Sequence, residues 1–133
     1  MRREHEPRLA RSREELEAAR VLVDREFFAQ ATSRAYYAAF YAAGEALFVL
    51  GETRSRHSGV VAAFAHLVVR EGTVDEAVGR ALRSLFDQRS AADYGGLPIS
   101  GKQAAAALEQ ASQVVAAVER WLSDRPRKQE PAP

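Results

Sequence analysis

The residues best suited to chemistry lie in the stretch DQRSAADYGG, residues 87–96, where an arginine and an aspartate stand four positions apart. Arg89 follows Leu82 by seven residues and Leu85 by four, so in a helix it projects from the apolar face. An arginine there must be paired or must face a cleft, because an unpaired buried charge is very costly. Asp93, one turn further along the helix, is its natural partner.

This pair conflicts with two rules of helix stability. An arginine that precedes its acidic partner by four residues is in the less favourable order. An acidic residue in the last turn also opposes the helix dipole. Broken local rules are expected at functional sites. The alternative is that Arg89 only ties the helix end to a carbonyl or carboxylate of a neighbouring helix, and the sequence leaves both interpretations open.

A second group of polar and aromatic residues lies in SRAYYAAFYAAGEALF, residues 33–48. Ser33, Arg34 and Tyr37 come close together on the first half of the expected helix, and more aromatic residues follow at spacings of three and four. A stripe of this kind is more often core than binding surface. The tyrosines nevertheless bring hydroxyl groups that need hydrogen-bond partners, so Tyr37 is a candidate for stacking on or hydrogen bonding to a ligand.

A third candidate is RSRHSG, residues 54–59, which places His57 at the start of a helix between basic neighbours. A helix N-terminus favours anions and lowers the pKa of a histidine, so this segment is a candidate phosphate site. The alternative is an ordinary helix start with exposed arginines. The three histidines have no metal-ligand spacing, and no glycine-rich phosphate loop or nucleophile elbow occurs. We therefore expect neither a metal nor a cofactor.

Composition excludes several classes of protein. The chain has 133 residues, a formal net charge of +1 and no cysteine. A disulfide framework and a thiolate zinc site are therefore ruled out, and the charge alone does not predict nucleic-acid binding. No apolar run reaches the roughly 18 residues of a membrane span, and no apolar segment of a signal peptide follows the charged N-terminus. A cytoplasmic protein without membrane contact is expected.

The elements that position these residues are predicted to be five helices, and strand signals are nearly absent. The expected ranges are 7–25, 28–50, 55–71, 73–94 and 100–125, with Gly51 ending the second helix. TVDE at 73–76 and SGKQ at 100–103 read as capping boxes. Short connections between amphipathic helices predict an all-α, up-and-down antiparallel bundle of four to five helices over residues 1–125. Residues 126–133, rich in proline and charge, are expected to be a disordered tail.

Three segments taken together resemble the small prokaryotic HEPN domains: SRAYYAAFYAAGEALFVLG, RHSGVVAAFAHLVVREG and LRSLFDQRSAADYG. Their order and spacing match across about residues 8 to 123. The specific features are the pattern YY-x-x-F, then H-S-G opening the next helix, then R-x-x-A-D-Y closing the fourth. The resemblance implies a helical bundle that usually dimerises and is often encoded beside a nucleotidyltransferase, with which it forms a toxin–antitoxin-like pair.

The resemblance also implies an activity, because many HEPN proteins are metal-independent ribonucleases. Their motif is an arginine, four to six residues, then a histidine, which serves as acid or base while the arginine stabilises charge on the phosphorus. The motif arginine maps onto Arg89. The corresponding histidine positions hold Tyr94, Gly95 and Gly96, so the chain departs from the motif at the acid–base residue.

We therefore expect a HEPN-type protein that binds a nucleotide, RNA or a partner nucleotidyltransferase, with weak catalysis or none. One alternative is a metal-independent ribonuclease in which His57 or Tyr94 replaces the missing histidine and Arg89 remains catalytic. Another is a purely structural dimeric bundle. The expected binding residues are Arg89, Asp93, Tyr94, Tyr37, Ser33, Arg34 and His57.

Overall fold

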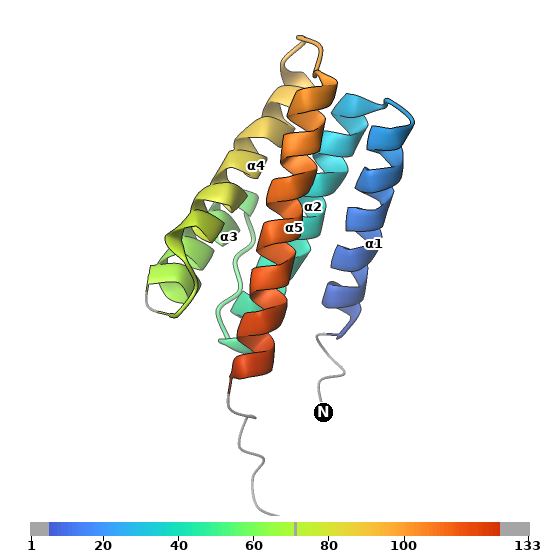
Figure 1. The fold of residues 1–133 in the computed structure, drawn as a ribbon. Helices are drawn as coiled ribbons and strands as arrows, with labels where there is room; N and C mark the ends of the chain where they lie inside the picture. Colours follow the sequence, from blue (N-terminus) through green and yellow to red (C-terminus); the bar gives the residue numbers. More distant parts are fainter. Residues whose placement is uncertain (1–5, 71, 126–133) are drawn as a thin grey trace, which may run out of the picture.

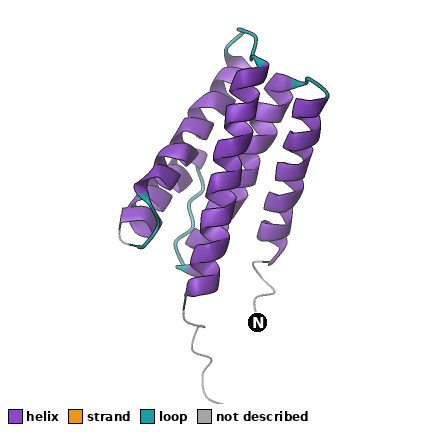
Figure 2. Cartoon of the chain, in the orientation of Figure 1, coloured by secondary structure: helices purple, strands orange, loops and turns teal. Residues whose placement is uncertain are grey.

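The computed structural model describes residues 6–70 and 72–125, and no strand occurs among them. Four long helices run up and down side by side: α1 (Glu6–Asp24), α2 (Phe28–Val49), α4 (Glu76–Tyr94) and α5 (Gly101–Asp124) (Figure 1). A shorter α3 (His57–Ala63) continues into a π-helical segment, η1 (Phe64–Arg70). Figure 2 shows helices joined by short loops. The predicted all-α antiparallel bundle is confirmed, and the expected tail at 126–133 lies outside the described residues.

Helix α2 forms the centre of the bundle, where it packs against every other helix. It can do so because its buried side chains are mostly methyl groups, which allow neighbouring helices to approach closely. The fully buried alanines of α2 are Ala35, Ala38, Ala39, Ala42, Ala43 and Ala46. Larger side chains from α4 and α5, such as Leu82, Leu85 and Val118, fill the space around them and are also fully buried.

Two polar contacts fasten α1 to α2. The buried hydroxyl of Ser12 donates a hydrogen bond to the backbone oxygen of Ala38 at 2.7 Å. The carboxylate of Glu15, which is 7% exposed, accepts two bonds from Arg34 Nη1, at 2.9 and 3.0 Å. A nearly buried carboxylate needs such partners. The position of Arg34 on α2 is therefore fixed by α1.

The end of α2 follows the expectation for Gly51, which has a φ of +75°. The amide of Gly51 donates to the oxygen of Phe48 at 2.9 Å, and that of Glu52 donates to the oxygen of Leu47 at 2.8 Å. This is the Schellman arrangement, which needs a residue in the left-handed region. The loop 50–56 then runs back along the bundle, so that α3 begins beside the middle of α2 (Figures 1 and 2).

One capping prediction is confirmed and the other is wrong. Ser100 and Gln103 make both bonds of the capping box that begins α5. At the start of α4, however, the N-cap is Asp75 and not Thr73. Its carboxylate accepts a hydrogen bond from the amide of Ala77 at 2.8 Å, and the helix begins at Glu76. An aspartate is at least as good an N-cap as a threonine, which accounts for the later start.

Among the described residues, none of the helices is both long enough and apolar enough to cross a bilayer.

Candidate functional site

Arg89 lies on the inner side of α4, as the heptad spacing predicted. Its side chain is only 14% exposed. The guanidinium lies over two aromatic rings of α2, with its central carbon 5.2 Å from the centroid of Tyr36 and 5.6 Å from that of Tyr37. A cation over the face of a tyrosine is attracted by the ring electrons. Arg89 thus lies in a largely aromatic setting between α4 and α2.

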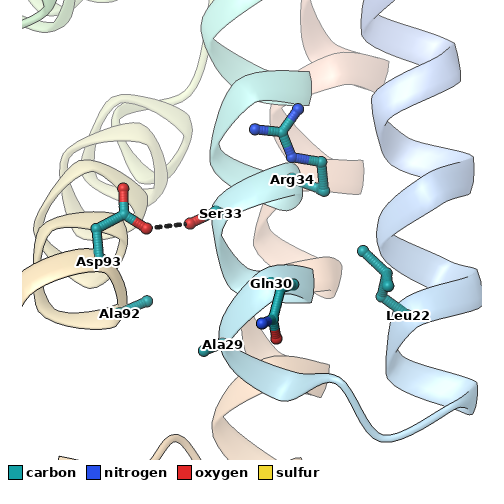
Figure 3. A pocket seen from close by; sticks show the side chains of 7 residues that line it. All are labelled: Leu22, Ala29, Gln30, Ser33, Arg34, Ala92 and Asp93. Carbon is teal, nitrogen blue, oxygen red and sulfur yellow. Dashed lines mark hydrogen bonds between the residues drawn. The ribbon is translucent and has the colours of Figure 1, made fainter. Parts of the chain in front are cut away.

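Asp93 connects Arg89 to the first half of α2. Arg89 Nη1 donates to Asp93 Oδ2 at 3.3 Å. The hydroxyl of Ser33 donates to Asp93 Oδ1 at 2.6 Å, and Figure 3 shows this second bond. Burial by itself would lower the pKa of Arg89. The hydrogen bond that Arg89 donates to Asp93, together with the electrostatic interactions of Arg89 with its neighbours, more than offsets this, so the pKa of Arg89 is raised. The side chain is therefore a permanent cation.

His57 joins the site from the start of α3. Its Nδ1 lies 3.0 Å from the hydroxyl oxygen of Tyr36 and 3.3 Å from Arg89 Nη2. An arginine nitrogen only donates, so the contact with Arg89 requires Nδ1 to be an acceptor and places the proton of the neutral ring on Nε2. Burial and, to a lesser extent, the charge of Arg89 lower the pKa of His57. The imidazole is therefore held in its neutral form.

Aromatic rings hold the imidazole in place. The ring of His57 stacks on that of Phe40 with centroids 4.2 Å apart and an interplanar angle of 26°. Tyr37 meets it edge-on at 5.9 Å. Offset stacking of this kind restricts the ring to one orientation. Among the described residues there is no group of three or more histidine, aspartate or glutamate side chains arranged to hold a metal ion.

Tyr36 was not among the residues expected from the sequence, although it belongs to the centre of the site. Its side chain is fully buried, and its hydroxyl is bonded to His57. Burial raises the pKa of Tyr36, so the hydroxyl keeps its proton. The available signal was the general requirement that a buried tyrosine hydroxyl find a partner. That requirement applied equally to Tyr37 and did not distinguish the two.

The expected site residues divide into three groups. Helices α2, α3 and α4 bring together the first group, which consists of Arg89, Asp93, Ser33, His57 and Tyr37. Arg34 lies beside them, over the ring of Tyr37 at 4.9 Å, while its guanidinium is engaged by Glu15. Tyr94 is 80% exposed at the end of α4, and among the described residues no hydrogen bond or cation–π contact joins it to Arg89.

The fold and the site define a class of protein: an all-helical bundle in which an arginine near the end of one helix meets an imidazole from another. A family model described as the HEPN domain matches residues 5–121. Since the match covers most of the chain, the protein belongs to the HEPN domain family.

Curated relatives agree with this assignment. A UPF0332 protein of Thermotoga maritima is 39% identical over 65% of this chain and 66% of its own length. A protein of Methanocaldococcus jannaschii named "Putative toxin MJ0605" is 29% identical over 84% of this chain and 83% of its own. The crystal structure of TT1696 from Thermus thermophilus shares the fold, with a TM-score of 0.75, 22% identity, and coverage of 90% of this chain and 98% of that one.

Proposed function

We propose that the Arg89–His57 site binds a phosphate group of RNA or of a nucleotide. The observation that carries the proposal is the 3.3 Å approach of Arg89 Nη2 to His57 Nδ1, which brings a permanent cation and an imidazole together from two separate helices. Arginine is well suited to phosphate because its donors match the spacing of phosphate oxygens. The neutral imidazole of His57 carries its proton on Nε2 and can supply a further hydrogen-bond donor.

Two further features support a nucleic-acid ligand. The half-buried ring of Tyr37 lies beside both Arg89 and His57, and bases of single-stranded RNA commonly stack on such rings. The neutral imidazole also makes a weak partner for the guanidinium. A phosphate would replace it with a full negative charge, and charge-assisted hydrogen bonds are about twice as strong as neutral ones.

Binding is tested by fluorescence anisotropy with a labelled single-stranded oligoribonucleotide at fixed salt, since affinity for nucleic acid depends on ionic strength. The variants are Arg89→Met and His57→Gln. The matched control is Arg83→Met, which removes an exposed arginine of the same helix. We expect both site variants to bind at least about tenfold more weakly than the control. Equal binding by Arg89→Met and Arg83→Met contradicts the proposal.

A second candidate function is metal-independent cleavage of RNA. The specific observation in its favour is that His57 reaches Arg89, although the positions expected for the motif histidine hold Tyr94, Gly95 and Gly96. In this reaction the 2′-oxygen attacks the adjacent phosphorus. The bond from phosphorus to the 5′-oxygen breaks, and that oxygen takes a proton from water while the proton removed from the 2′-hydroxyl returns to the solvent, which leaves a 2′,3′-cyclic phosphate and a free 5′-hydroxyl.

The roles of the side chains in that reaction follow from their contacts. A bound phosphate draws the guanidinium of Arg89 away from His57, so Nδ1 can then carry the ring proton and donate it to the hydroxyl oxygen of Tyr36, which leaves the lone pair of Nε2 free. The lowered pKa of His57 keeps this nitrogen unprotonated near neutrality, so it can accept the proton of the 2′-hydroxyl. Arg89 then stabilises the charge that develops on the phosphoryl oxygens.

Cleavage is tested by incubating mixed RNA with the purified protein in EDTA. If the second candidate is right, the wild type and Arg83→Met release cyclic-phosphate ends, while Arg89→Met and His57→Gln do not. If the wild type binds RNA and leaves it intact, the site is a binding site only. Cleavage that persists in Arg89→Met comes from a contaminant or from another site.

The biological setting we infer is a cytoplasmic toxin–antitoxin-like pair. Two curated relatives in Methanocaldococcus jannaschii carry the word toxin in their names, which supports this role. We expect a homodimer and a nucleotidyltransferase as the partner. Light scattering tests the first expectation, with a mass of twice 14.6 kDa. Co-purification with a nucleotidyltransferase encoded beside this chain tests the second.

A further inference from the structure

An open hollow lies beside the Ser33–Asp93 hydrogen bond, and both of these residues line it. It is formed where the end of α1, the start of α2 and the end of α4 meet, and its volume is about 510 Å³. Figure 3 shows the side chains around it. The residues that line it are Leu22, Ala29, Gln30, Ser33, Arg34, Ala92 and Asp93.

The hollow combines an apolar surface with a few polar groups at its edge. Leu22, Ala29 and Ala92 provide aliphatic surface from three different helices. Gln30 adds an amide that can both donate and accept a hydrogen bond, and Asp93 adds a carboxylate. Apolar walls with a small number of polar groups are typical of sites that bind small organic molecules.

Asp93 joins the hollow to the site of the proposed phosphate. One carboxylate oxygen of Asp93 accepts from Arg89, and the other accepts from Ser33 at the edge of the hollow. The guanidinium and the hollow are therefore separated by a single carboxylate. That separation is comparable to the distance between the phosphate of a nucleotide and its own base, with the ribose between them.

We propose that the hollow holds one nucleoside of an RNA strand whose adjoining phosphate is bound by Arg89, with the ribose beside Asp93. This inference rests on the proposed function, because Arg89 must first bind the phosphate. The base lies against the aliphatic surface, and the amide of Gln30 contacts its polar edge. The ribose 2′-hydroxyl donates a hydrogen bond to the carboxylate of Asp93.

This arrangement predicts a preference for RNA over DNA. The 2′-hydroxyl is the group that distinguishes the two sugars, and a carboxylate is a strong acceptor for it. DNA lacks the 2′-hydroxyl, so the carboxylate of Asp93 would not receive this hydrogen bond from a DNA strand. We expect a deoxyribonucleotide strand of the same sequence to bind about tenfold more weakly, since hydrogen bonds to charged groups carry this much discrimination.

The test fills the hollow without touching Arg89. Ala92→Leu adds three carbon atoms on α4 inside the hollow, and Ala29→Leu does the same from α2. The matched control is Ala91→Leu, the exposed neighbour on α4 that does not line the hollow. Circular dichroism verifies that each variant is folded. Anisotropy with the same labelled oligoribonucleotide then measures binding of the wild type, these three variants and Arg89→Met.

We expect Ala92→Leu and Ala29→Leu to weaken RNA binding on the order of tenfold, the loss typical for one bound base, and Ala91→Leu to bind like the wild type. The ratio of the affinity for RNA to the affinity for DNA should be smaller in Ala92→Leu and Ala29→Leu than in the wild type. If both filled variants bind normally while Arg89→Met does not, the hollow is not a nucleoside site and the proposed phosphate site stands. If the wild type binds no RNA, the proposed function fails and this inference fails with it.

Discussion

Replacing Arg89 by methionine separates a binding role from a structural one. Methionine keeps much of the length and the aliphatic packing of the side chain and removes the guanidinium. If Arg89 served mainly to fix helix packing, the substitution would break a buried ion pair and lower the free energy of unfolding by about 3–5 kcal/mol. The contacts of Arg89 indicate a much smaller loss.

The magnitude follows from four contributions, of which the long hydrogen bond to His57 Nδ1, at 3.3 Å, adds about 0.5 kcal/mol. The ion pair with Asp93 is partly exposed, because 32% of the aspartate side chain is accessible, so it contributes at most about 1 kcal/mol. The position over Tyr36 and Tyr37 adds about 1 kcal/mol. Against these, Nε of Arg89 is buried without a hydrogen-bond partner among the described residues, which costs about 1–3 kcal/mol. The contributions nearly cancel, so we expect a change within about 1 kcal/mol.

Urea denaturation followed by circular dichroism measures the stability of Arg89→Met and of the control Arg83→Met. Anisotropy on the same samples measures RNA binding. We expect the two variants to have similar unfolding free energies while Arg89→Met binds RNA about 10- to 100-fold more weakly. A loss of stability of about 3 kcal/mol or more would refute this reasoning and favour the structural role.

Three further predictions concern pH and the helix starts. Because the pKa of His57 is lowered by folding, the unfolded chain takes up a proton more readily, so stability should decline as the pH falls below about 6.5 and should be fully present above it. Chemical denaturation at a series of pH values measures this for the wild type and His57→Gln. Asp75→Ala should lower the unfolding free energy by about 1 kcal/mol, because Asp75 caps α4. Ser100→Ala should cost about as much at the start of α5. Urea midpoints compare both with the wild type.

Each of these predictions has a control in the chain. The matched control for His57→Gln is His66→Gln, which removes an exposed histidine of η1. A His57→Gln variant with an unchanged pH dependence would show that another group titrates. Thr73→Ala should stay within about 0.5 kcal/mol of the wild type, because Thr73 is not the N-cap. If Thr73→Ala lowered the unfolding free energy more than Asp75→Ala does, Thr73 would be the N-cap after all, as the sequence predicted.

Local patterns were enough to predict the helices. The predicted end of α2 rests on Gly51, and the predicted start of α5 rests on Ser100 with Gln103. These residues make the expected hydrogen bonds. The Arg89–Asp93 contact was also predictable, since residues four apart on a helix are neighbours. The start of α4 was not, because Thr73 and Asp75 are both good N-caps and only the course of the preceding loop selects between them.

The amino-acid sequence by itself determined the five helices, the inward position of Arg89 and the resemblance to the HEPN family. Only the tertiary structure placed His57 against Arg89, 32 residues away, and Ser33 against Asp93, 60 residues away. Helical periodicity fixes distances within one helix and says nothing about which helices meet. Here the loop 50–56 returns along α2 and carries His57 back to Tyr36, and the close packing of the alanines of α2 then brings α3 and α4 to the same side chains.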